Sequence, residues 1–65
     1  MEFKEKVILL RAKLNISQGK LAELLKVTTN TISRWETGKF NPTKKDELLF
    51  NEFCKQNKVS FEEVK

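Results

Sequence analysis

The feature of this sequence that most constrains its fold is a pair of short helical segments with only a tight turn between them. Apolar residues recur at helical spacing in residues 18–25, and Ser17 can cap the start of that segment. Thr28 can cap a second segment over residues 28–36, and Gly38 can supply the positive φ at which such a helix ends. Two short helices joined in this way form a helix-turn-helix. The apolar residues behind this prediction are Leu21, Ala22, Leu24, Leu25, Ile32 and Trp35.

Helical patterns also precede and follow this pair. The first helix carries apolar residues at helical spacing and ends near Asn15, a residue that tolerates the left-handed conformation. We expect a fourth helix to open at Asn41-Pro42-Thr43, with Pro42 near its first turn. Residues 60–63 read as a capping box for a short last turn carrying Phe61 and Val64. The apolar positions of the first and fourth helices are Phe3, Val7, Ile8, Leu10 and Leu14, then Leu49, Phe50, Phe53 and Cys54.

No stretch alternates with the period of a β-strand, so the predicted fold is all-α: a compact four- to five-helix bundle in a single domain, residues 1–65. Cys54 is the only cysteine and there is no histidine, so neither an internal disulfide nor a Cys/His zinc site is expected. Cys54 falls on an apolar stripe and reads as a small core residue. The longest N-terminal apolar run, Val7 to Leu10, is too short for a signal sequence or membrane span, so we expect a cytoplasmic protein.

Charge is distributed unevenly along the chain, whose net charge is +4. Residues 26–45 carry five basic groups against Glu36 alone, whereas residues 46–65 carry three basic and five acidic groups. A basic centre of this kind suggests one face turned toward a polyanion. With no histidine, glycine-rich phosphate loop or acid pair in an evident cleft, we expect neither an enzyme nor a bound cofactor.

The segment NISQGKLAELLKVTTNTISRWETGKFNP resembles the Cro/CI-type (Xre) helix-turn-helix family. The resemblance implies a lambda-repressor-like fold and a DNA-binding transcriptional regulator of bacterial or phage origin. The sequence departs from the family at Lys26, where glycine is frequent, at Gly19-Lys20, and in a longer stretch between Pro42 and Val59. The matching positions are Ser17-Gln18, Leu21-Ala22, Val27, Thr31-Ile32-Ser33-Arg34-Trp35-Glu36, Gly38-Lys39 and Pro42.

Residues that read bases are expected on the outward face of the second helix of the pair. Arg34 can bond guanine O6 and N7, and Asn30 can bond adenine N6 and N7. In the family, the residues that match Thr29, Asn30, Ser33 and Arg34 contact bases, and we expect the same here. An arginine on an exposed helix is otherwise commonly a solvated charge.

Phosphate contacts are expected at helix starts and beyond the recognition helix. Gln18 lies at a helix N-terminus, which favours an anion, and the family uses the matching glutamine on a phosphate. Thr28 is expected to act in the same way, although it can equally be an ordinary N-cap. The resemblance places Arg11 near Glu36 as a structural pair, with a phosphate contact by Arg11 as the alternative. The remaining candidates are Lys20, Thr37, Lys39, Lys44 and Lys45, of which the last two can equally be solvated.

Proteins of this class usually bind two half-sites as two-fold dimers, so we expect a homodimer on an inverted-repeat DNA operator. Phe50, Phe53, Phe61 and Val64 could form the dimer surface or could simply close the monomer core, and both readings stay open. Because a compact domain blocks polymerase without an added surface, repression is the expected mode of regulation. A helix-turn-helix used for protein contact, as in an adaptor or antitoxin, is the alternative function.

Overall fold

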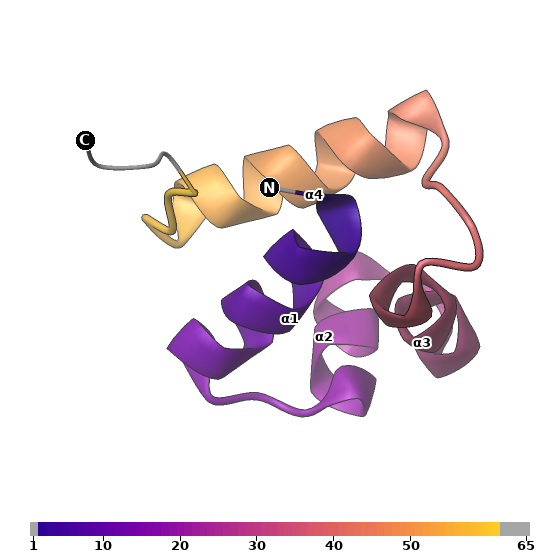
Figure 1. Ribbon diagram of the computed structural model, residues 1–65. Coiled ribbons are helices and arrows are strands. Elements are labelled where there is room, and N and C mark those ends of the chain that lie inside the picture. The colour runs from indigo at the N-terminus through magenta and orange to yellow at the C-terminus, as the bar shows by residue number, and fades with distance from the viewer. Residues whose placement is uncertain (1, 62–65) are drawn as a thin grey trace.

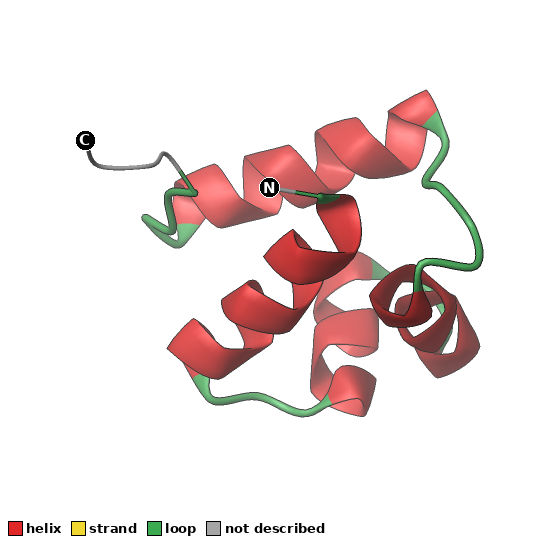
Figure 2. Ribbon diagram, in the orientation of Figure 1, coloured by secondary structure: helices red, strands yellow, loops and turns green. Residues whose placement is uncertain are grey.

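The computed structural model describes residues 2–61 and contains four helices with no strand among these residues (Figure 2). The predicted all-α fold is confirmed. In chain order the helices are α1 (Phe3–Leu14), α2 (Gln18–Leu25), α3 (Thr29–Thr37) and α4 (Lys44–Gln56). None of them is long and apolar enough to cross a membrane.

Side-chain caps determine where three of the helices begin. The hydroxyl oxygens of Ser17, Thr28 and Thr43 accept hydrogen bonds from the backbone N–H groups three residues further on, at 3.0, 3.1 and 3.1 Å. Thr43 is therefore the N-cap of α4, so the helix opens within the predicted Asn41-Pro42-Thr43 segment, with Pro42 directly before the cap. Ser60 and Phe61 are not helical, and the rest of the short turn predicted there, including Val64, lies outside the described residues.

Left-handed residues end the first three helices. Asn15, Lys26 and Gly38 have φ values of 54°, 60° and 75° respectively. Asparagine and glycine are common at such positions, whereas Lys26 adopts the conformation despite its Cβ atom. The tight turn between α2 and α3 therefore forms without the glycine that is frequent in the Cro/CI-type family.

A single core is built from residues of all four helices. Leu25 is buried on α2 but its neighbour Leu24 is 43% exposed, and Leu49 on α4 is exposed to the same extent beside the fully buried Phe50. Adjacent helical residues point about 100° apart, so only one of each pair faces the core, and the inward placement predicted for Leu24 and Leu49 is wrong. Ile8 of α1 is likewise exposed. The buried residues are Val7, Leu10, Leu21, Ala22, Leu25, Ile32, Trp35, Phe50 and Cys54.

Aromatic rings connect α3 to the rest of the bundle. Figure 1 shows α3 packed beside α1 and α2, while α4 crosses above them. The ring of Phe3 meets Trp35 of α3 and Phe50 of α4 edge to face, with centroids 5.2 and 5.0 Å apart. Phe61 in turn stacks on Phe50 at 6.2 Å. Phe50 and Phe61 thus pack within the core of one chain, as expected if they close the monomer core rather than form the dimer surface.

Candidate nucleic-acid interface

The rotation of α3 about its own axis is fixed by two buried side chains. Ile32 is wholly buried and Trp35 is 4% exposed, because they pack against α1 and α2. The opposite face of α3 therefore points to solvent. The side chains exposed there are Thr29, Asn30, Arg34 and Thr37, whereas Ser33 is half-buried at the edge of this face.

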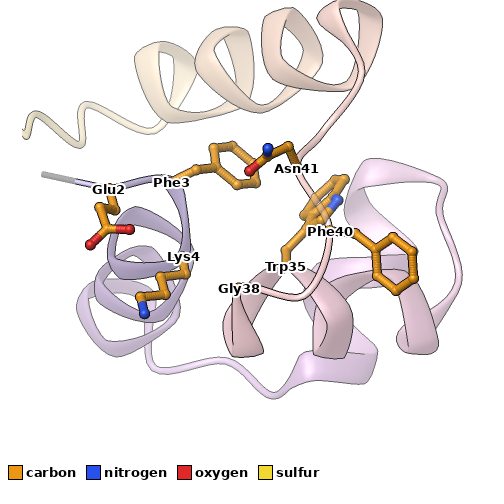
Figure 3. A pocket seen from close by; sticks show the side chains of 7 residues that line it. All are labelled: Glu2, Phe3, Lys4, Trp35, Gly38, Phe40 and Asn41. Atoms are coloured by element: carbon orange, nitrogen blue, oxygen red, sulfur yellow. The ribbon is translucent and has the colours of Figure 1, made fainter.

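Arg34 is held against an exposed aromatic ring from the loop after α3. Its guanidinium carbon lies 5.0 Å from the centroid of Phe40, whose side chain is 55% exposed. Figure 3 shows the Phe40 ring turned away from the side chains of Phe3 and Lys4. A guanidinium over an aromatic face is attracted to it and loses part of its rotational freedom before any ligand binds. Sequence reasoning missed Phe40; the available signal was a large aromatic in a polar loop that no helical stripe requires.

The structure brings Arg11 and Glu36 together in a two-pronged ion pair, the arrangement that the resemblance implied. Arg11 Nε donates to Glu36 Oε2 at 2.6 Å and Arg11 Nη2 donates to Oε1 at 3.1 Å. The third nitrogen, Nη1, donates to the carbonyl of Ile16 at 3.2 Å. The pair therefore ties α1 and the start of the α1–α2 loop to the end of α3.

The Gln18 amide completes this network. Its Nε2 donates to Glu36 Oε1 at 2.8 Å, so the side chain expected on a phosphate is held by the carboxylate. Burial raises the pKa of Glu36, but the hydrogen bonds from Arg11 and Gln18 and the charge of Arg11 outweigh it and lower the pKa. The hydrogen bond to Glu36 raises the pKa of Arg11. An amide nitrogen carries two N–H groups, so Gln18 retains one donor for a ligand.

The remaining phosphate candidates divide into those with a hydrogen-bond or ion-pair partner and those without an ion-pair partner among the described residues. Thr28 caps α3 and shares a hydrogen bond with the Thr31 hydroxyl at 2.9 Å, while Thr37 donates to the carbonyl of Arg34 at 3.0 Å. Lys20 pairs with Glu23 at 3.2 Å on the exposed surface. The last three candidates are exposed and form no ion pair within residues 2–61: Lys39, Lys44 and Lys45.

The N-terminal ends of α2 and α3 lie side by side. A Cβ atom built on Gly19 would lie 3.9 Å from Thr29 Oγ1. The unpaired backbone N–H groups of both helix starts are thus near each other, next to the exposed face of α3. This arrangement suits a polyanion that passes the two helix ends while α3 enters a groove.

A narrow cleft separates the start of α1 from the end of α3 (Figure 3). Lys4 covers Gly38 there, and a Cβ atom on Gly38 would come within 3.0 Å of Lys4 Cδ. Trp35 forms one wall, with Phe3 beside it. The lining of the cleft has no cysteine or histidine, and no group of side chains that could hold a metal ion is found among residues 2–61.

Two short helices at a tight turn, the second with a polar outer face, define a helix-turn-helix protein. The chain belongs to the helix-turn-helix family, because the model of the family described as "Helix-turn-helix" matches residues 7–46. This membership confirms the resemblance to the Cro/CI type.

One curated relative also matches. The HTH-type transcriptional activator BcrR of Enterococcus faecalis is 50% identical over 42 residues, which are 65% of this chain and 21% of the relative. The chain therefore spans about a fifth of the length of that protein. No solved structure matches the chain.

Proposed function

We propose that this protein binds double-stranded DNA with α3 in the major groove. The observation that carries the proposal is the orientation of α3, whose buried Ile32 and Trp35 leave a polar and cationic face outward. Arg34 is proposed to read guanine and Asn30 adenine, the bases whose edges match a guanidinium and an amide. Thr29 and Ser33 complete the base-reading set.

The phosphate contacts are proposed to come from both sides of α3. After its C-terminal end, Lys39, Lys44 and Lys45 are exposed and form no ion pair with the residues that the structure describes, and Thr37 lies on the last turn of the helix. On the other side, Gln18 and Thr28 start α2 and α3, and Lys20 can exchange Glu23 for a phosphate because that ion pair is exposed. Contacts of this kind provide affinity and register without sequence information.

The protein is proposed to bind an inverted-repeat operator as a homodimer, with one α3 helix in each half-site. Occupied promoter DNA excludes polymerase without a further protein surface, so repression is the first expected outcome. The relative from Enterococcus faecalis is named a transcriptional activator, which makes activation the second candidate. A reporter gene behind the recovered operator separates the two, because expression falls with repression and rises with activation.

The experiment that tests DNA recognition is selection of bound sequences from a random duplex library at about 150 mM salt, a physiological ionic strength. An enriched inverted repeat is expected. The matched control is the same selection with Asn30→Ala, which should lose the preference at one position per half-site and keep the rest of the repeat. A folded protein that enriches no sequence would contradict the proposal and indicate a protein-binding role.

A further inference from the structure

Helix α4 carries an exposed apolar stripe that the core does not use. Leu48 is 69% exposed and Leu49 is 43% exposed, on the side of the helix away from the buried Phe50. Together with Lys45 and Glu52 they line a shallow apolar depression. These positions share one face because helical residues three, four and seven apart lie in a row.

The charges on this stripe are arranged symmetrically. Lys45 precedes Leu48 by three residues and Glu52 follows Leu49 by three, so opposite charges lie equally far from the centre of the apolar pair. Within residues 2–61 neither of the two forms an ion pair. A surface that is apolar at its centre and oppositely charged at its two ends is complementary to an inverted copy of itself, which is the requirement for a two-fold interface.

We propose that α4 is the dimer surface, pairing antiparallel with α4 of a second copy of this chain. With the two-fold axis midway between Leu48 and Leu49, Lys45 faces Glu52 of the partner subunit and each leucine meets its counterpart. In this dimer Lys45 contacts the partner subunit rather than a phosphate, and Lys39 and Lys44 remain for the DNA backbone. The interface contains two such ion pairs by symmetry. This inference rests on the dimeric binding in the proposed function and assigns its contact surface, in place of the phenylalanines that close the core.

The direct test is disulfide cross-linking of Leu48→Cys in the absence of DNA, since that residue lies beside its own copy at the axis. Burial raises the pKa of the native Cys54 to about 11, so its thiol stays protonated and reacts slowly at neutral pH. The matched control is Ile8→Cys, an exposed apolar position on α1, where the residue is 48% exposed against 69% for Leu48. We expect the dimer to form roughly tenfold faster from Leu48→Cys than from the control, because pairing raises the local thiol concentration.

Charge reversal then tests the arrangement itself. Adding Glu52→Lys should slow cross-linking about tenfold at low salt, because lysines would face one another twice. Adding Lys45→Glu to that variant should restore the rate, because it re-forms both pairs with their signs exchanged. Both changes suit the dipole of α4, with the new acid near its start and the new base toward its end, so the helix is retained.

Each outcome bears on one proposal only. Equal rates for Leu48→Cys and Ile8→Cys, or a double reversal as slow as Glu52→Lys alone, would overturn the α4 interface. An operator recovered by selection would still support DNA binding in that case. Conversely, charge-dependent cross-linking with no enriched sequence would support the α4 interface and contradict the proposed function.

Discussion

At the scale of single residues, Arg34 combines the two properties that base reading needs. It is exposed on α3, and the Phe40 ring 5.0 Å away restricts its guanidinium. Replacing Arg34 by alanine should weaken binding to the selected operator by about 1–3 kcal/mol and relax the preference at one base pair. Arg34→Lys should keep the phosphate attraction but lose the bidentate bond to guanine. Fluorescence anisotropy on the operator and its single-base variants measures both effects.

The alternative role of Arg34 gives a different pattern. A loss of affinity that is equal on every sequence, or a lysine variant with unchanged base preference, would make Arg34 a phosphate contact. Phe40→Leu is the companion variant, because it keeps an apolar side chain without the aromatic face. It should reduce the discrimination at the base read by Arg34 and leave the other positions as they are.

The outward residues of α3 were predictable because helical spacing alone sets which side chains oppose Ile32 and Trp35. The stack of Phe40 on Arg34 was not, since it depends on the course of the loop after Gly38. The same limit applies to Gln18. Its position at the start of α2 was predicted. Its hydrogen bond to Glu36 was not, because that bond depends on how close α2 and α3 pack, which the sequence does not give.

At the scale of elements, replacing either of two glycines by alanine should change the stability of the fold, in opposite directions at the two positions. Gly38 has φ of 75° and a Cβ there would lie 3.0 Å from Lys4 Cδ, whereas Gly19 is helical and its Cβ would meet only atoms 3.9 Å away. Gly38→Ala should destabilise the fold by about 1–2 kcal/mol. Gly19→Ala should stabilise it by about 0.5–1 kcal/mol. Thermal unfolding followed by circular dichroism should show the melting temperature falling in the first variant and rising in the second; changes of equal sign would contradict the assigned backbone geometry.

Glu36 links α3 to α1 and α2 through its hydrogen bonds with Arg11 and Gln18. Glu36→Gln should lower the free energy of unfolding at pH 7 by about 1–3 kcal/mol, because Arg11 loses its charged partner. The lowered pKa of Glu36 means that the folded state holds the carboxylate in its ionised form. The advantage of the wild type is therefore complete above the usual glutamate pKa of about 4.3 and declines as pH falls through the lower folded-state pKa.

Urea denaturation at pH 7 and at pH 3 measures this difference. The matched control is Glu23→Gln, which removes the exposed pair with Lys20 and should change stability by about 0.5 kcal/mol or less. A gap between the wild type and Glu36→Gln that stays constant across this pH range would contradict the role given to the ion pair.

Element boundaries followed from the sequence where side chains cap helices, as at Ser17 and Thr28. The start of α4 lies in the predicted Asn41-Pro42-Thr43 segment, but proline and threonine at neighbouring positions can each begin a helix, and the Thr43 hydrogen bond identifies the cap. The exposure of Leu49 was also missed. A run of apolar residues tells which helix is amphipathic, but the neighbouring helices determine which edge of the run is covered.

At the scale of the whole molecule, affinity should follow the placement of unpaired cations around α3. Lys39 lies directly after Gly38 at the end of α3, whereas Lys55 occupies the last turn of α4, which Figure 1 shows at the far end of that helix from α3. Neutralising one phosphate contributes about 0.9 to the slope of log affinity against log salt. Lys39→Ala should therefore flatten the slope by about one unit and weaken all sequences alike. Lys55→Ala removes the same charge and should leave the slope unchanged. Equal slopes for the two variants would mean that net charge, rather than a defined phosphate clamp beside α3, governs binding to DNA.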